Sequence, residues 1–130
     1  MVGKLLTMKL LKGHYAVCRF NKGHAIPEWA YIGSFFSITS TMDELSIVCN
    51  EDNLPEGITC SRGWSVLKIQ GPLDFSLIGI LSGISSILAS KGISIFAVST
   101  YDTDYILVKN NDIEDAITAL AEENYEIKKE

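Results

Sequence analysis

The residues best suited to binding a small molecule lie in one short stretch, Pro72-Leu73-Asp74-Phe75-Ser76. This stretch stands where an expected strand ends and the longest expected helix begins. Free backbone N–H groups at a helix N-terminus attract carboxylates, and the helix dipole adds to the attraction. The Asp74 carboxylate would accept hydrogen bonds from an ammonium group, although an N-cap role is the commoner one for aspartate at this position. This stretch is therefore the best anion-recognition point in the chain.

A second group of candidate residues surrounds an expected strand and the turn that follows it. Ser99 and Thr100 either line a pocket or are simply hairpin residues of good β-propensity. Asp104 is a further carboxylate for an ammonium group, and a turn residue in the commoner interpretation. Ile95 and Phe96 point to opposite faces of the strand, so that one belongs to the core and the other is available to a partner unit.

No motif of a common enzyme class is present. The sequence has no His-Glu-x-x-His, Cys-x-x-Cys, phosphate-binding loop, Gly-x-Ser-x-Gly or Rossmann glycine pattern. We therefore expect a binding protein with no catalytic residues, no metal and no cofactor. An enzyme that uses Asp74 or Asp104 as an acid or base is the weaker hypothesis, since catalytic residues can converge from distant positions.

Composition narrows the partners and the location. The chain has 130 residues, of which 47% are hydrophobic and 21% charged, with a net charge of -5. An acidic chain repels nucleic-acid phosphates and anionic membranes, so neither is an expected partner. No run approaches the roughly 18 apolar residues of a membrane span, and the N-terminus lacks the pattern of a signal peptide. We expect a cytoplasmic protein.

The three cysteines, Cys18, Cys49 and Cys60, are odd in number and far apart in the sequence. Disulfides are not expected in a reducing compartment. Cys18 and Cys49 lie in apolar strand patterns, where a free cysteine behaves as a small buried hydrophobe. We expect both to be core residues.

Alternating strand and helix patterns fill the second half of the chain. Between two of the strands, residues 75–91 carry apolar residues at helical spacing, and Gly92 follows in the position of a left-handed cap. A second helix follows Asp112, a good N-cap. The expected strands are 64–69, 93–98, 105–109 and 125–128. The order β-α-β-β-α-β is that of a ferredoxin-like unit.

The first half repeats the second with its helices reduced. Residues 34–52 align with residues 94–112 without gaps at an offset of 60, and five positions are identical. Only the stretch 27–31, which begins with a proline, is left for a short helix. We therefore predict an α+β protein with two ferredoxin-like units in tandem: a degenerate unit at residues 1–61 and a complete one at residues 62–130.

Two runs of sequence resemble a family of small tandem ACT-domain proteins, a family type that includes the ACT regions of cytosolic arginine sensors. They are Gly63-Trp64-Ser65-Val66-Leu67-Lys68-Ile69-Gln70-Gly71-Pro72-Leu73-Asp74-Phe75-Ser76 and Gly92-Ile93-Ser94-Ile95-Phe96-Ala97-Val98-Ser99-Thr100-Tyr101-Asp102-Thr103-Asp104-Tyr105-Ile106-Leu107-Val108. In the first half, Phe35-Phe36-Ser37-Ile38 and residues 44–49 resemble the family's other signature.

The resemblance implies a regulatory module that binds an amino acid or a similar small ligand. ACT units usually pair, within or between chains, and ligands lie at their junctions; this adds Phe36 and Ser37 to the candidate ligand contacts. The family's usual loop is Asp-x-Pro-Gly-Leu, whereas this chain has Gly71-Pro72-Leu73-Asp74-Phe75. That departure leaves the identity of the ligand open.

The alternative is a pairing module that acts through protein contacts alone. Small residues recur along the long helix and either form a packing face or lie in solvent: Gly79, Ser82, Gly83, Ser86 and Ser90. Exposed sheet edges also favour pairing, so we expect a homodimer.

Overall fold

The computed structural model describes residues 6–70 and 79–130. The chain forms two compact units, and each is considered by itself. The first unit is Gly13–Trp64. The second unit joins the residues up to Lys12 to Ser65–Glu130, so that the first unit is inserted into the second.

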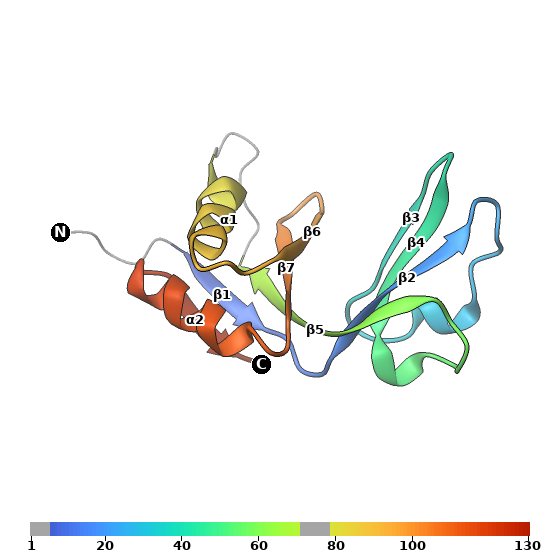
Figure 1. Cartoon of the computed structure of the whole chain (residues 1–130), viewed down its shortest axis with the longest axis horizontal. Helices are drawn as coiled ribbons and strands as arrows, with labels where there is room; N and C mark the ends of the chain where they lie inside the picture. The colour runs from blue at the N-terminus through green and yellow to red at the C-terminus, as the bar shows by residue number, and fades with distance from the viewer. Residues whose placement is uncertain (1–5, 71–78) are drawn as a thin grey trace. The chain divides into compact units, whose positions relative to one another are not determined.

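The sheet of the second unit has the strand order β8-β1-β5-β7-β6 (Figure 1). β1 runs antiparallel to β5 and parallel to β8, and β6 runs antiparallel to β7. The strands are β1 (Thr7–Leu10), β5 (Cys60–Ile69), β6 (Ile95–Ser99), β7 (Asp104–Lys109) and β8 (Glu126–Lys129).

The N-terminal strand lies in the second unit, whereas the predicted division into residues 1–61 and 62–130 assigned it to the first. Met8 of β1 faces Ile69 of β5 on one side and Ile127 of β8 on the other. Met8 is fully buried there. β1 therefore separates β5 from β8, two strands that a ferredoxin-like unit built from residues 62–130 alone would pair directly.

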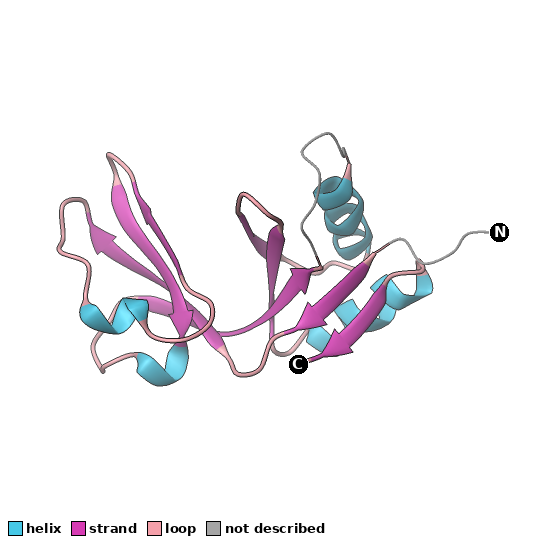
Figure 2. Cartoon of the chain, turned by 180° about the vertical axis from the view of Figure 1, so that it is seen from behind, coloured by secondary structure: helices cyan, strands magenta, loops and turns pink. Residues whose placement is uncertain are grey.

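Two helices, α1 (Ile80–Ser90) and α2 (Ile113–Glu122), cover one face of this sheet. They lie in front of the strands in Figure 1 and behind them in Figure 2. Ile84 and Leu88 of α1 are completely buried, as is Leu120 of α2. These residues pack on Ile69 and the other inward-facing residues of the strands. The apolar periodicity therefore predicted the correct faces of both helices.

The first helix begins at Ile80, five residues later than predicted. Gly79, which precedes it, has a φ of +81°, a left-handed conformation that breaks the helix and that only glycine adopts at little cost. Gly79 is the N-cap of α1, and Asp74, the cap that the sequence suggested, lies outside the described residues. The opposite end agrees with the sequence, because Gly92 follows the helix with a φ of +73°. Asp112 is the N-cap of α2, as predicted.

The first unit has the strand order β3-β4-β2-β5. Its strands are β2 (Tyr15–Asn21), β3 (Ser37–Ser40) and β4 (Glu44–Asn50), with the first residues of β5 completing the sheet. Two short 3-10 helices replace the long helices, η1 (Glu28–Tyr31) and η2 (Glu51–Asn53). The short helix of one or two turns expected at residues 27–31 is therefore confirmed. Ala30 of η1 is buried on one sheet face together with Ala16, Leu45 and Ile47.

The turns of the two hairpins, β3–β4 and β6–β7, have the same hydrogen-bonding pattern. Ser40 faces Leu45 across the first turn, and Ser99 faces Asp104 across the second. In each turn a threonine, Thr41 or Thr100, donates from its backbone N–H and its hydroxyl to the carbonyl three residues later. The turns therefore correspond at an offset of 59. The predicted offset of 60 is wrong by one residue, because apolar strands align acceptably in either register.

The fold is α+β, as predicted, with helices and a mixed sheet in the second unit. Among residues 6–70 and 79–130, no helix has the length and apolar character that crossing a membrane requires.

Candidate functional site

The predicted ligand loop, Pro72-Leu73-Asp74-Phe75-Ser76, lies outside the described residues. The strand that leads to it is well defined. Ile69, the last residue of β5, is fully buried, and the next residue, Gln70, donates its backbone N–H to the Thr7 carbonyl at 2.8 Å. The chain therefore leaves the sheet between β1 and β7, and it re-enters described structure at Gly79.

The turn between β6 and β7 is fastened to this same strand end. The Thr103 hydroxyl donates a 2.7 Å hydrogen bond to the Ile69 carbonyl. Thr103 is one of only a few buried polar residues in the described chain, with 5% of its surface exposed. This bond holds the turn beside the start of the predicted ligand loop. Sequence reasoning missed Thr103, because nothing local marks a turn threonine as the partner of a carbonyl 34 residues away.

Thr100 has a structural role in this turn. Its hydroxyl donates to the Thr103 carbonyl at 2.9 Å and accepts from the Thr103 N–H at 3.3 Å. Of the two interpretations of Thr100, the structure therefore supports the hairpin one. A ligand would have to compete with the turn for this hydroxyl.

Ser99 and Asp104 come together as directly opposed residues of β6 and β7. Ser99 is exposed and Asp104 is half-buried. Ile95 packs against the core beneath the helices, and residues two apart on a strand share a face. Ser99 and Asp104 therefore lie on the helix-covered side of the sheet, the side on which the chain continues into α1.

The remaining predicted contacts lie elsewhere. Phe96 points to the other face of the sheet from Ile95, where it is half-buried opposite Leu107. Ile95 is thus the residue that packs against the core, and a partner unit at Phe96 stays a prediction. Phe36 and Ser37 belong to the first unit. There the Phe36 ring meets Tyr31 edge-on at 5.9 Å, and Ser37 faces Val48.

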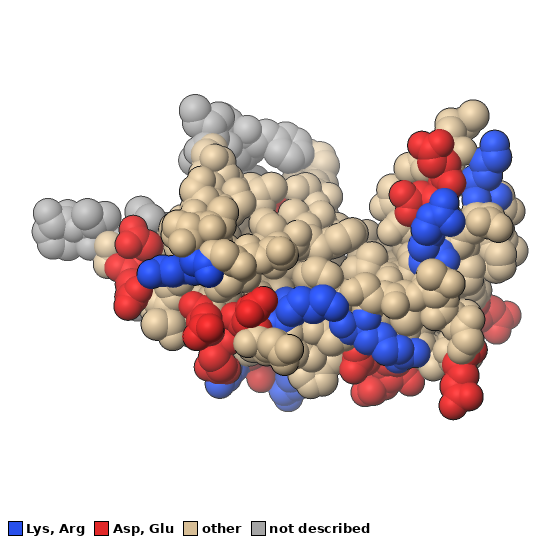
Figure 3. Space-filling model, viewed as in Figure 1, with Lys and Arg blue, Asp and Glu red and all other residues tan. Residues whose placement is uncertain are grey.

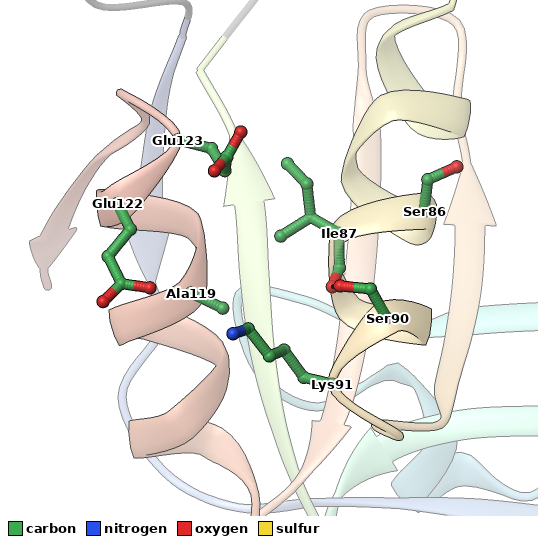
Figure 4. Close-up of a pocket in the computed structure, with 7 residues that line it drawn as sticks. All are labelled: Ser86, Ile87, Ser90, Lys91, Ala119, Glu122 and Glu123. Atoms are coloured by element: carbon green, nitrogen blue, oxygen red, sulfur yellow. Dashed lines mark hydrogen bonds between the residues drawn. The ribbon is translucent and has the colours of Figure 1, made fainter.

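A hollow that the sequence did not indicate lies between α1 and α2 of the second unit. It has a volume of about 340 Å³ (Figure 4). Ile87 and Lys91 reach into the gap from α1, and Glu123 from α2, while Ser86 points away. The lining residues are Ser86, Ile87, Ser90, Lys91, Ala119, Glu122 and Glu123.

An adjoining hollow of about 280 Å³ extends the groove along α2 and shares Lys91, Ala119 and Glu122 with it. The combination of one ammonium group, several carboxylates and an apolar floor is compatible with a zwitterion. The three ionisable groups at the rim of the larger hollow, Lys91, Glu122 and Glu123, are exposed. Water therefore weakens any electrostatic attraction that they exert.

In the described parts of the chain, no group of three or more histidine, cysteine or acidic residues is placed to hold a metal ion. Acidic and basic side chains alternate over the face shown in Figure 3. Burial, and then the charge of Glu123, raises the pKa of the Tyr125 phenol.

Comparison with known proteins agrees with the fold. The ACT domain family model matches residues 59–122, which include the predicted ligand loop and the β6–β7 hairpin. A separate model for an N-terminal domain matches residues 13–57, nearly the whole of the first unit.

Two solved structures and one curated protein illustrate the range of relatives. Protein Atu0741 from Agobacterium tumefaciens is 42% identical, with a TM-score of 0.91, over 99% of this chain and 96% of that one. The ligand-free regulatory subunit of aspartate kinase from Thermus thermophilus has a TM-score of 0.63 at 12% identity, over 92% and 98% of the two chains. This second likeness shows the fold alone.

The curated relative is the cytosolic arginine sensor for mTORC1 subunit 1 from Bos taurus, 28% identical over 68% of this chain. The match covers 30% of that protein's length. The family model, the matching fold and the sequence likeness agree with one another. Residues 59–122 of this chain belong to the ACT-domain family.

Proposed function

We propose that this protein binds an amino acid and acts as a regulatory or sensor protein rather than as an enzyme. The observation that carries the proposal is the ACT domain match over residues 59–122, because it spans both the predicted loop and the hairpin whose Thr103 bonds to Ile69 at the end of β5. ACT domains are regulatory. The bovine relative is named as an arginine sensor, and several solved structures with this fold are regulatory parts of aspartate kinases.

The proposed site is the loop Pro72-Leu73-Asp74-Phe75-Ser76 together with Ser99 and Asp104. Two carboxylates and two serine hydroxyls offer acceptors to an ammonium group, and the loop offers backbone N–H donors to a carboxylate. Asp104 supports this arrangement, because it lies next to Thr103, whose hydroxyl bonds to the strand end that leads to the loop. We place the protein in the cytoplasm, in keeping with its free cysteines and with the name of the bovine relative.

The test is a thermal-shift screen of the full chain against each of the twenty amino acids. A ligand present at 100 times its Kd adds about 2.7 kcal/mol to the free energy of unfolding, which gives a clear rise in Tm. We expect one amino acid, or one chemical class, to raise Tm. A flat response across all twenty would contradict the proposal.

Variants then locate the site. Asp74→Ala and Asp104→Asn should abolish the rise in Tm, whereas Asp43→Ala, which changes an exposed aspartate of the first unit, should leave it intact. Lys91→Gln tests the groove between the helices. Loss of the response in Lys91→Gln alone would move the site to that groove.

The second candidate function is pairing with another copy through the sheet edge. β6 pairs only with β7, so one edge of β6 has no partner strand in the described chain, and Ala97 on it is exposed. An open edge is a template for strand addition. Sedimentation of the protein without amino acids should then show a homodimer, and Ala97→Lys should shift it to the monomer. A monomer in the unchanged protein would exclude this pairing.

A further inference from the structure

Three cysteine side chains that are distant in the sequence gather on one face of the first unit. Cys18 lies on β2, Cys49 on β4 and Cys60 at the start of β5, and all three belong to the same apolar cluster or pack against it. Cys18 lies on the central strand, between the strands that carry the other two cysteines. All three are free, so none of these thiols is already committed to a disulfide.

Cys18 and Cys60 form the pair with disulfide geometry. They are directly opposed on antiparallel strands. The neighbouring Arg19 N–H donates to the Thr59 carbonyl at 3.0 Å, so Arg19 and Thr59 are a hydrogen-bonded pair. Hydrogen-bonded and non-hydrogen-bonded pairs alternate along an antiparallel ladder. Cys18 and Cys60 are therefore a non-hydrogen-bonded pair, the kind in which the Cα atoms are about 4.5 Å apart, within the range that a disulfide spans.

Cys49 is not equivalent to Cys60. It faces Ala16, while Cys18 faces Ile47, so Cys18 and Cys49 are diagonal neighbours. Diagonal residues of a sheet have their Cα atoms about 7–8 Å apart, beyond the span of an unstrained disulfide. The register of the strands therefore favours a Cys18–Cys60 disulfide over the other two possible pairs of cysteines.

Exposure gives the two cysteines different roles. Cys18 is 1% exposed, whereas Cys60 is half-buried at the end of its strand and is open to a reagent. The hydrogen bond with Cys49, and then burial, raises the pKa of Cys18, while the positive charge of Arg62 opposes that rise. A cysteine that reacts with a dissolved reagent is typically at least partly exposed. Cys60 is therefore the thiol that meets an oxidant first, and Cys18 is the one that follows.

We propose that Cys18 and Cys60 are a site of reversible oxidation by low-molecular-weight disulfides such as glutathione disulfide. The Cys60 thiolate attacks one sulfur of glutathione disulfide, forms a mixed disulfide and releases one glutathione thiolate. The Cys18 thiolate then attacks the Cys60 sulfur, forms the Cys18–Cys60 bond and releases the second glutathione thiolate. The two protein thiols are oxidised, one glutathione disulfide is reduced, and the two protons go to the two glutathione thiolates.

The test is non-reducing peptide mapping of the folded full chain after incubation with glutathione disulfide and an acid quench. We expect one dominant linked peptide pair, Cys18 with Cys60, with Cys49 still a free thiol, and full reversal by dithiothreitol. The oxidised protein should also show a Tm several degrees higher, because the link joins β2 to β5 across a long loop.

Three variants separate the roles of the cysteines. The Cys49→Ala protein should still form the Cys18–Cys60 disulfide. The Cys60→Ser protein should form no disulfide and no adduct with glutathione. Cys18→Ala should stop at the mixed disulfide on Cys60. If the Cys18→Ala protein fails to fold, the Cys60→Ser and Cys49→Ala proteins still test the proposal. Cys60 is half-buried, so its change to serine should disturb the fold little. A Cys18–Cys49 bond, a stable glutathione adduct on the unchanged protein, or no reaction would each overturn the proposal.

Discussion

The Thr103 hydroxyl donates a 2.7 Å hydrogen bond to the carbonyl of Ile69, a residue 34 positions earlier in the chain. This bond joins the β6–β7 turn to the strand end from which the proposed ligand loop begins. It also gives a buried hydroxyl its partner: in the described chain no buried side-chain polar atom lacks a hydrogen bond.

Thr103→Val should destabilise the protein by roughly 1–3 kcal/mol, because valine keeps the shape but leaves the Ile69 carbonyl without this donor. Urea unfolding of the full chain measures the loss. Thr103→Ser should recover most of it, and Thr39→Val, at an exposed strand position, should change stability little. Equal effects for Thr103→Val and Thr39→Val would show that the bond contributes nothing.

The matching turns allow a comparison within one molecule. Thr41→Val and Thr100→Val each remove the hydroxyl that bonds to the carbonyl three residues later. Each should cost about 0.5–1.5 kcal/mol, the usual net contribution of one hydrogen bond. Hydrogen exchange of the two hairpins should show that each change loosens only its own hairpin. Loosening of both hairpins by one change would contradict this local role.

Gly83 and Tyr125 should be energetically coupled. A Cβ added at Gly83 would lie 3.3 Å from the Tyr125 hydroxyl oxygen, a tight contact. Alanine is favoured over glycine inside a helix by about 0.5–1 kcal/mol. We therefore expect Gly83→Ala to stabilise the Tyr125→Phe protein more than it stabilises the unchanged protein. A double-mutant cycle measures the difference, and a coupling energy of zero would mean that the ring moves aside freely.

Tyr125 should also make stability fall at alkaline pH. Burial and then the Glu123 charge raise its pKa above the ordinary 10.0, so the folded state holds the phenol proton more tightly than the unfolded state. This contribution is fully present below the unfolded pKa and is lost as the pH rises through the folded pKa. Between about pH 9 and pH 11, the free energy of unfolding should fall less for the Tyr125→Phe protein than for the unchanged protein. Parallel curves would contradict the assignment.

The sequence predicted elements well where a periodic pattern faces one core. The helical stripe of Ile84 and Leu88, the cap at Gly92 and the N-cap at Asp112 are all confirmed. These features depend on local geometry and on a single buried face, and both leave a clear trace in the order of residue types.

The pairing of strands that are distant in the sequence could not be predicted in this way. β1 is a four-residue strand, and nothing in its composition says that it inserts between β5 and β8. β5 extends unbroken from Cys60 to Ile69, across the expected boundary between residues 61 and 62. Gly79 was treated as part of the helix, because its left-handed conformation depends on the path of the chain before it.

The candidate site also has one part that was predictable from the sequence and one part that was not. The pairing of Ser99 with Asp104 follows from hairpin geometry, which alternation within the hairpin makes predictable. The bond from Thr103, the groove at Lys91 and the thiol cluster around Cys18 each join residues that are remote in the sequence. No local pattern marks such residues.

The most direct measurement is a set of nitrogen-15 NMR spectra of the full chain with and without an equimolar mixture of the twenty amino acids. The account predicts shifts in the backbone signals of Gln70 and Ser99–Asp104, around the start of the proposed ligand loop. Signals of the first unit's Glu44–Cys49 strand serve as the internal reference. Unchanged spectra at millimolar concentrations of each amino acid would contradict amino-acid binding, and shifts confined to Lys91, Ala119 and Glu122 would contradict the proposed site.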